Sequence, residues 1–251
     1  MNKTIKDLAK KYKLNKIEKR RLNAEFEIIK LRTEFAVFKS KKEKRPLYKS
    51  LVKYGGIERF FQKLTKKQYQ KLANKLKKLK SENLNQKDIN QIALNMFNKS
   101  DYKKEIIQNY IPSKCFTYGM WKNKGVAIHF RNAVVPKNPF KGKEYEKRKQ
   151  ELKDIALEVK EKYPKAKYVF SISWMWNLKV FQSFMPKSFN KSLKKYEEKL
   201  FYSGAHWGQF YKYTGSLNKK RVKQFKKNWK FPFKTVLGEC SIKDFYDMYL
   251  K

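Results

Sequence analysis

The chain has two histidines, and the imidazole is the side chain that titrates nearest to neutral pH. His129 lies in the segment VAIHFRN, at the end of an expected strand, and His206 lies in SGAHWGQFY, between two glycines. Each imidazole has the chemistry of a general base. The alternative is a structural histidine whose ring is satisfied by a backbone hydrogen bond, and the sequence leaves both interpretations open.

The two cysteines favour no metal site, because Cys115 and Cys240 are far apart and lack a ligand spacing. We expect them to be reduced, buried thiols. The sequence also has no phosphate loop of the form G-x-x-x-x-G-K-[ST], no G-x-G-x-x-G, no G-x-S-x-G and no cluster of acids. We therefore expect no metal, and no cofactor held by a glycine-rich loop.

The second part of the chain predicts a mixed sheet that would position His129. Strand–helix–strand order is typical of an α/β fold. In chain order we expect these elements: a hairpin of Cys115–Trp121 and Val126–Phe130, a helix over residues 143–162, a strand at Tyr168–Trp176 and a helix from Asn177 to Pro186. They are followed by a helix at Leu217–Trp229, a strand at Thr235–Cys240 and a last helix capped by Ser241.

The first part of the chain predicts helices only. Apolar residues recur at helical spacing between Ile17 and Phe38, and Pro46 ends that helix. Shorter helices are expected at Ile57–Leu64, Thr65–Leu79 and from the Asn83–Asp88 region to Phe97. We predict an α/β (α+β) fold in which a helical region, residues 1–111, precedes an α/β domain with a mixed sheet, residues 112–251.

Positive charge covers both parts. The chain has 63 Lys+Arg and 22 Asp+Glu, a net charge of +41. Residues 1–111 carry 31 basic and 11 acidic residues, and residues 112–251 carry 32 and 11. Such an excess favours a polyanionic partner, because counterion release drives its binding. Lysine dominates over arginine, which favours phosphate contact rather than the reading of base edges. The alternative is a codon bias toward lysine.

Basic residues interleaved with aromatic side chains suit single-stranded nucleic acid, since bases stack on rings while lysines follow phosphates. The leading functional hypothesis is therefore binding of nucleic acid, RNA or a ribonucleoprotein above all. The candidate contacts are Lys39, Lys41, Lys42, Lys44, Arg45, Tyr211, Tyr213, Lys219, Lys220, Arg221, Lys226 and Lys227. The alternative is that Trp174, Trp207 and Phe210 belong to a core. We favour it for the apolar strand that carries Trp174 and leave it open for Tyr211 and Tyr213.

A resemblance to a known protein family supplies the alternative functional hypothesis. VAIHFRN, the helix at 143–162, YVFSISWMWN and FMPKSF together resemble the C-terminal half of a GNAT-like acyltransferase family, over about residues 125–190. The corresponding positions are His129, Ser173, Trp174, Pro186 and Ser188. The resemblance implies acyl transfer from a thioester such as acyl-CoA to an amine, with His129 or His206 as base. The chain departs from the family pattern in having no R/Q-x-x-G-x-G/A loop for a CoA pyrophosphate.

A third hypothesis is a protein without enzymatic activity that binds an acidic protein partner, since charge alone does not separate it from the first. No apolar run approaches the length of a membrane span, and the first sixteen residues are too charged for a signal peptide. We expect no membrane partner and a cytoplasmic location.

Overall fold

The computed structural model describes residues 3–56, 70–71, 74, 76–98, 100–108, 113–122, 124–196 and 204–251. The helix expected at Ile57–Leu64 and much of the one at Thr65–Leu79 lie outside the described residues. The described residues form helices and a five-stranded mixed sheet, so the fold is α/β as expected.

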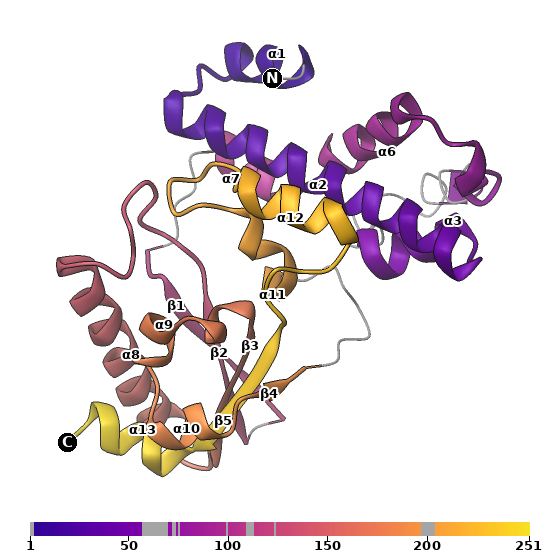
Figure 1. The fold of residues 1–251 in the computed structure, drawn as a ribbon. Coiled ribbons are helices and arrows are strands. Elements are labelled where there is room, and N and C mark those ends of the chain that lie inside the picture. Colours follow the sequence, from indigo (N-terminus) through magenta and orange to yellow (C-terminus); the bar gives the residue numbers. More distant parts are fainter. Residues whose placement is uncertain are drawn as a thin grey trace. The chain divides into compact units, whose positions relative to one another are not determined.

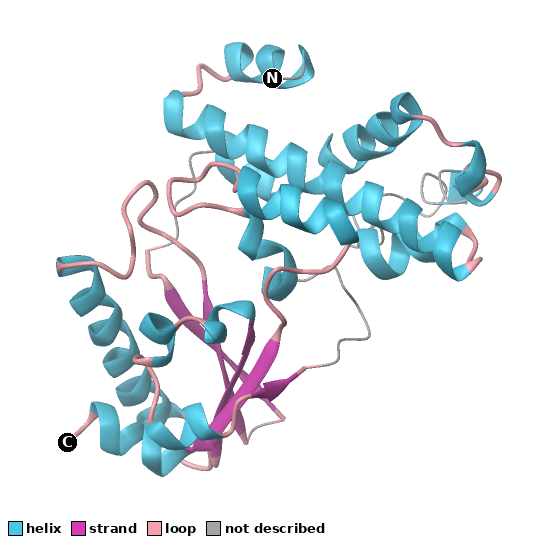
Figure 2. Ribbon diagram, in the orientation of Figure 1, coloured by secondary structure: helices cyan, strands magenta, loops and turns pink. Residues whose placement is uncertain are grey.

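The chain forms two compact units, which Figures 1 and 2 draw in one orientation. We call Met1–Tyr110 with Glu198–Lys230 the helical unit, and Ile111–Glu197 with Phe231–Lys251 the sheet unit. The first boundary lies beside the expected one at 111/112. The expected domain 112–251 needs correction, however, because residues 204–230 group with the helical region rather than with the sheet.

The helical unit is organised around one long helix, α2 (Lys16–Glu43). Asn15 and Glu18 form a reciprocal capping box at its start, and Lys44 ends it in a left-handed conformation. The other described helices before the sheet are α1 (Lys3–Lys11), α3 (Leu47–Ser50), the π-helix η1 (Leu51–Gly55), the 3-10 helix η2 (Ser81–Asn83), α6 (Gln86–Asn98) and α7 (Asp101–Ile107).

Aromatic packing explains why residues 204–230 belong to this unit. The segment forms α11 (Gly204–Trp207), the 3-10 helix η4 (Gly208–Phe210) and α12 (Lys219–Asn228). The Phe35 ring of α2 lies 6.0 Å from that of Trp207 and 5.2 Å from that of Phe225. Figure 1 shows α12 alongside α2. Trp207, Phe210 and Phe225 are completely buried, so the core of the helical unit requires both chain segments.

The sheet of the sheet unit has the strand order β1-β2-β3-β5-β4. β2 is antiparallel to β1 and parallel to β3, whereas β5 is antiparallel to both β3 and β4. The strands are β1 (Phe116–Trp121), β2 (Gly125–Phe130), β3 (Tyr168–Ser173), β4 (Lys194–Lys195) and β5 (Val236–Ser241). The predicted hairpin, the strand at 168 and the strand at 235 are therefore confirmed, whereas the two-residue β4 was not predicted.

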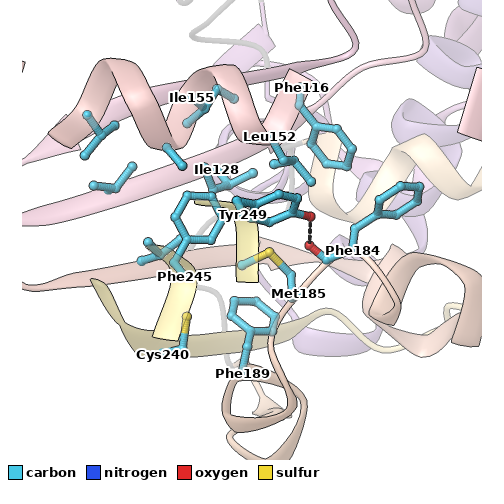
Figure 3. Packing of buried hydrophobic residues seen from close by; sticks show 14 of the residues in the cluster. Phe116, Ile128, Leu152, Ile155, Phe184, Met185, Phe189, Cys240, Phe245 and Tyr249 are labelled. Atoms are coloured by element: carbon cyan, nitrogen blue, oxygen red, sulfur yellow. Dashed lines mark hydrogen bonds between the residues drawn. The ribbon is translucent and has the colours of Figure 1, made fainter. Parts of the chain in front are cut away.

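One face of this sheet is buried beneath α8 (Lys143–Lys162) and α13 (Ile242–Tyr249). In Figure 3 Leu152 and Ile155 of α8 lie with Ile128 of β2, and the Tyr249 hydroxyl donates to the Phe184 carbonyl at 2.7 Å. The helix expected over residues 143–162 is confirmed. The expected strand Tyr168–Trp176 ends earlier, because the Ser173 hydroxyl caps the 3-10 helix η3 (Trp174–Asn177) by accepting a hydrogen bond from Met175 N.

The helix expected from Asn177 to Pro186 is shorter and is followed by a second one. α9 spans Lys179–Gln182, and α10 (Lys187–Lys191) begins directly after Pro186. Phe189 of α10 packs against the backbone of β5, where a Cβ on Gly238 would lie only 2.3 Å from its ring. Both short helices thus belong to the covered face. Within the described residues no helix has the length and apolarity that crossing a membrane requires.

Candidate active site where two parallel strands diverge

The parallel strands β2 and β3 pair over only half of their length. Their register runs from Gly125 opposite Tyr168 to Ala127 opposite Phe170, although both strands continue for three more residues. At the end of the ladder the buried Ser171 hydroxyl donates to the Ile128 carbonyl at 2.8 Å. A side-chain hydroxyl therefore takes the place that the next backbone N–H of β3 would fill in a continuous ladder.

Beyond this point each strand presents unpaired backbone groups toward the other. Arg131 N donates to Cys115 O of the neighbouring β1 side at 2.9 Å. Because the direction of backbone groups alternates along a strand, Phe130 directs its N–H and C=O toward β3. Ile242 N donates to Lys167 O at 2.9 Å on the β5 side, so the same alternation directs the Ile172 N–H and C=O toward β2.

These groups of Phe130 and Ile172 have no hydrogen-bond partner within the part of the chain that the structure describes. Neither residue is fully buried. Paired backbone groups are the rule in folded proteins, and an unpaired set in the middle of a sheet is a place for a ligand or for water. The geometry suits an extended ligand with amide groups, which would bind as an added strand.

The side chain of Phe130 fixes this end of β2. Its ring lies 5.1 Å from that of Phe116, 5.1 Å from that of Phe140 and 5.4 Å from that of Phe181. These rings come from β1, from the loop before α8 and from α9. The divergence is thus held open by packing rather than left to a mobile strand end.

His129 lies on the sheet face opposite α8. Val126 and Ile128 are buried against the core, and His129 is exposed by the two-residue alternation of a strand. A Cβ on Gly119 of β1 would lie 3.8 Å from His129 Nε2, so the imidazole occupies the space above a residue without a side chain. Partial loss of hydration lowers the pKa of His129 below its ordinary value. The ring is therefore neutral at pH 7, as a general base must be.

His206 lies in the helical unit, whereas His129 lies in the sheet unit. It is only 4% exposed, and the next residue, Trp207, is completely buried. Burial, opposed by a hydrogen bond with the Ala205 backbone, lowers the pKa of His206 to about 4. A buried imidazole that stays neutral down to this pH fits the structural interpretation, so we no longer place His206 among the catalytic candidates.

The other positions of the acyltransferase resemblance lie around the end of β3. Ser173 caps η3, and Trp174 is buried with its ring stacked on that of Phe233 at 5.6 Å. Pro186 precedes α10, and the Ser188 hydroxyl donates to the Asp244 carboxylate at 2.6 Å. These side chains connect η3, α10 and α13 to the sheet, so their observed contacts are structural.

The basic candidates at the end of α2 surround one acid. Lys39 Nζ lies 2.8 Å from Glu43 Oε1, and Arg45 Nε lies 3.4 Å from Glu43 Oε2. Lys42 is exposed, and its ammonium lies 5.9 Å from the centre of the Phe38 ring. Lys42 and Lys44 are exposed and form no ion pair among the described residues. Lys41 is also exposed, and its charge is among the causes that lower the pKa of Glu82.

α12 carries six basic residues and no acid in ten positions. Lys219, Lys220 and Lys227 are exposed. Lys226 forms an ion pair with Glu34 of α2 at 2.5 Å, and Arg221 Nη1 donates to the Gln209 carbonyl at 2.8 Å. Two of the predicted nucleic-acid contacts therefore have structural partners inside the helical unit.

The two predicted tyrosines differ in environment. The Tyr211 hydroxyl donates to the Glu25 carboxylate of α2, and this contact holds the ring against the helical unit. Tyr213 is 52% exposed and follows Lys212 in the turn before α12. Of the two, Tyr213 is therefore the more exposed, and stacking on a base requires an exposed ring.

The basic segments of α2 and α12 meet through aromatic rings. Trp229 at the end of α12 stacks on Phe38 of α2 with ring centres 5.3 Å apart, and Lys42 lies over the same phenylalanine. We call the exposed lysines of these two segments the α2–α12 basic surface: Lys41, Lys42, Lys44, Lys219, Lys220, Lys223 and Lys227.

The open backbone groups of Phe130 and Ile172 were not predicted from the sequence. A serine inside the apolar strand YVFSIS was the available signal, because a buried hydroxyl requires an acceptor. Among the described residues no three His, Cys, Asp or Glu side chains lie together as metal ligands would. Comparison with known proteins gives no match for the chain: no family model, no curated protein and no solved structure is similar to it.

Proposed function

We propose that the sheet unit is an acyltransferase that transfers an acyl group from a thioester donor to an amine, in line with the GNAT-like resemblance. The observation that carries the proposal is the divergence of β2 and β3, with the unpaired backbone groups of Phe130 and Ile172 on its two sides. His129 lies on β2 directly before the first of these residues.

A thioester on a phosphopantetheine arm fits this opening by its chemistry. The arm is extended and contains amide groups, each with one donor and one acceptor. Backbone N–H and C=O groups bind such amides as they bind another strand. The aromatic rings packed on Phe130 give these groups a partly apolar surrounding, which strengthens such hydrogen bonds.

The reaction then needs one base and no covalent intermediate on the protein. The amine nitrogen attacks the thioester carbonyl, a C–N bond forms and the C–S bond breaks. The thiolate leaves and takes up a proton, while the neutral imidazole of His129 accepts the proton lost by the amine. A base of this kind contributes about 10²- to 10⁴-fold to the rate.

The test uses octanoyl-phosphopantetheine, with lysine as the amine. The expected result is a chemical-shift change at the Phe130 and Ile172 amides, at millimolar donor, and release of free thiol that depends on lysine. His129→Gln should lower the thiol release about 10²-fold or more, with little change in melting temperature. Absence of both amide shifts and thiol release would refute the proposal.

A second candidate function is binding of nucleic acid, and the absence of acids from α12 favours it. The α2–α12 basic surface would contact phosphates, with Tyr213 available for stacking. This was the leading hypothesis from charge. We place it second because lysines alone define no site, whereas the open strands do.

Replacement of Lys219, Lys220 and Lys223 with alanine tests this candidate against a matched control. The control is alanine at Lys153, Lys160 and Lys165, which are exposed on or near α8. Affinity for a single-stranded RNA should fall linearly on a log–log plot against salt, and the first variant should lower the slope by about 2. Equal slopes in both variants would exclude the α2–α12 basic surface.

A further inference from the structure

The loop between β2 and α8 is basic and lies beside the candidate active site. Residues 131–143 include Arg131, Lys137, Lys141 and Lys143 and no acid. Phe140 anchors the loop, since its ring packs on those of Phe130 and Phe181. Lys141 and Lys143 follow directly, are exposed and have no acidic partner among the described residues. Two exposed ammonium groups therefore follow, within three residues, the ring that packs on the end of β2.

The start of α8 does not suit the phosphates of a free coenzyme. Helix N-termini attract anions, but Glu144 already lies in the first turn. Its carboxylate is 3.3 Å from Arg148 Nη1, 3.7 Å from Lys147 Nζ and 3.8 Å from Lys137 Nζ. Glu146 adds a second acid in the same turn. No side chain that the structure describes caps the first N–H groups of α8, but a pyrophosphate placed there would meet the carboxylates of Glu144 and Glu146.

The distribution of the exposed positive charges favours a larger anionic partner. Lys141 lies at the exposed end of the loop and Lys143 is the exposed first residue of α8, so both charges face solvent. Lysines on an exposed rim contribute to encounter rate and partner choice by many weak contacts with dispersed carboxylates. A net charge of +41 makes the chain as a whole attractive to an acidic protein.

We propose that the thioester donor reaches this site on an acidic carrier protein, whose carboxylates contact Lys141 and Lys143 while its acylated phosphopantetheine arm lies between β2 and β3. This inference rests on the proposed acyltransferase function and names the donor for it. The covalent step is unchanged: the C–S bond to the carrier's arm breaks, a C–N bond forms, and the carrier leaves with a free thiol.

The experiment compares two donors and two charge variants on the full chain. The donors are an acyl carrier protein loaded with an octanoyl group, and octanoyl-CoA. The test variant is Lys141→Glu with Lys143→Glu. The matched control is Lys160→Glu with Lys165→Glu, which changes the net charge equally at the opposite end of α8, about 25 Å away along the helix axis.

The loaded carrier should bind more tightly than octanoyl-CoA, and its affinity should weaken as salt increases. The test variant should weaken carrier binding about tenfold or more, whereas the control variant should bind nearly as the parent protein does. The octanoyl-CoA affinity should change much less in the test variant. Circular dichroism of both variants confirms that each is folded.

Three other results would overturn the inference, in distinguishable ways. If octanoyl-CoA binds and reacts as well as the loaded carrier, the donor assignment fails but acyl transfer stands. If neither thioester binds or reacts, the proposed function fails with it. If a single-stranded oligonucleotide displaces the carrier and loses its own affinity in the test variant, the loop binds nucleic acid instead.

Discussion

The two units differ in how their cores relate to the sequence. In the sheet unit β2, α8 and β3 follow one another along the chain and pack together, so the core is largely built from sequence neighbours. In the helical unit Phe35 packs on Phe225, which lies 190 positions later. Local pattern predicts an element in either case, but it identifies the packing partner only in the first.

The two histidines also differ in how far their environments can be predicted from neighbouring residues in the sequence. Both follow small or apolar residues and looked equivalent in the sequence, yet His129 is exposed on a strand and His206 is buried among aromatic rings. Alternation within VAIHF already placed His129 on one face of a strand. The neighbouring Trp207 packs on Phe35, and no local pattern around His206 indicates this distant partner.

The substitution with the largest expected effect on stability is Phe225→Ala, and it tests this comparison of the two cores. Removing a completely buried ring should cost about 3–5 kcal/mol, because the rigid surroundings leave a cavity. Native-state hydrogen exchange should show lost protection in α2, while β3 and β5 keep theirs. The exposed Lys227→Ala on the same helix is the control, with an expected change below about 0.5 kcal/mol. Equal loss in both units would mean that they unfold as one, and the contrast in core construction would have no energetic counterpart.

The next effect concerns pH and the two histidines. The folded-state pKa of His206, about 4, lies below the ordinary value of about 6.5, so the unfolded chain binds more protons between these values. Stability is therefore retained above pH 6.5 and falls as pH decreases toward 4. Between pH 7 and pH 5 this group should remove about 2 kcal/mol.

Urea denaturation of the parent protein and of His206→Gln, at both pH values, measures this contribution. The difference between the two proteins should shrink at pH 5, because the variant has no imidazole to protonate. His129→Gln serves as the comparison and should change the pH dependence much less, since its side chain is exposed. An equal effect of the two variants would contradict the assigned environments.

The smallest expected effect is that of Ser171→Ala. The change leaves the Ile128 carbonyl without the hydroxyl that it accepts from, which should cost about 1–2 kcal/mol. Exchange of the amides that end the β2–β3 ladder should accelerate more than exchange in the β1–β2 pair. Ser192→Ala is the control for loss of a hydroxyl away from the divergence, since this hydroxyl donates to the Phe189 carbonyl and accepts from Glu239 N of β5. Unchanged exchange at the divergence would show that the aromatic rings alone hold the strands apart.

Sequence reasoning predicted most elements of the sheet unit, because alternation, turns and caps are local. The helix at 143–162 and the Ser241 cap of α13 were correct, as the cap accepts a hydrogen bond from Asp244 N at 3.0 Å. α7 was missed, although Ser100 caps it, because its seven residues are too few for a clear periodicity. The burial predicted for Trp174 is confirmed, and Trp207 and Phe210, for which a core role was the alternative, are buried as well.

The candidate site was only half predictable. His129 followed from its residue type and its place at a strand end. The open backbone groups of Phe130 and Ile172 depend on where the β2–β3 ladder stops, and register between strands separated by a helix is not encoded in any short segment. Arg221 and Lys226 were predicted to contact nucleic-acid phosphates. In the structure Arg221 donates a hydrogen bond to the Gln209 carbonyl, and Lys226 forms an ion pair with Glu34.

The alternation of segments between the two units has a consequence for synthesis on the ribosome. Residues 1–110, 111–197, 198–230 and 231–251 belong in turn to one unit and the other. N-terminal domains commonly fold while the rest of a chain is still being made. Here α2 must wait for Phe225 and Trp229 before its aromatic face is covered, so nearly the whole polypeptide has to emerge first. Until then Phe35 and Phe38 lie uncovered on a long helix, and we expect chaperones to bind such an exposed apolar face.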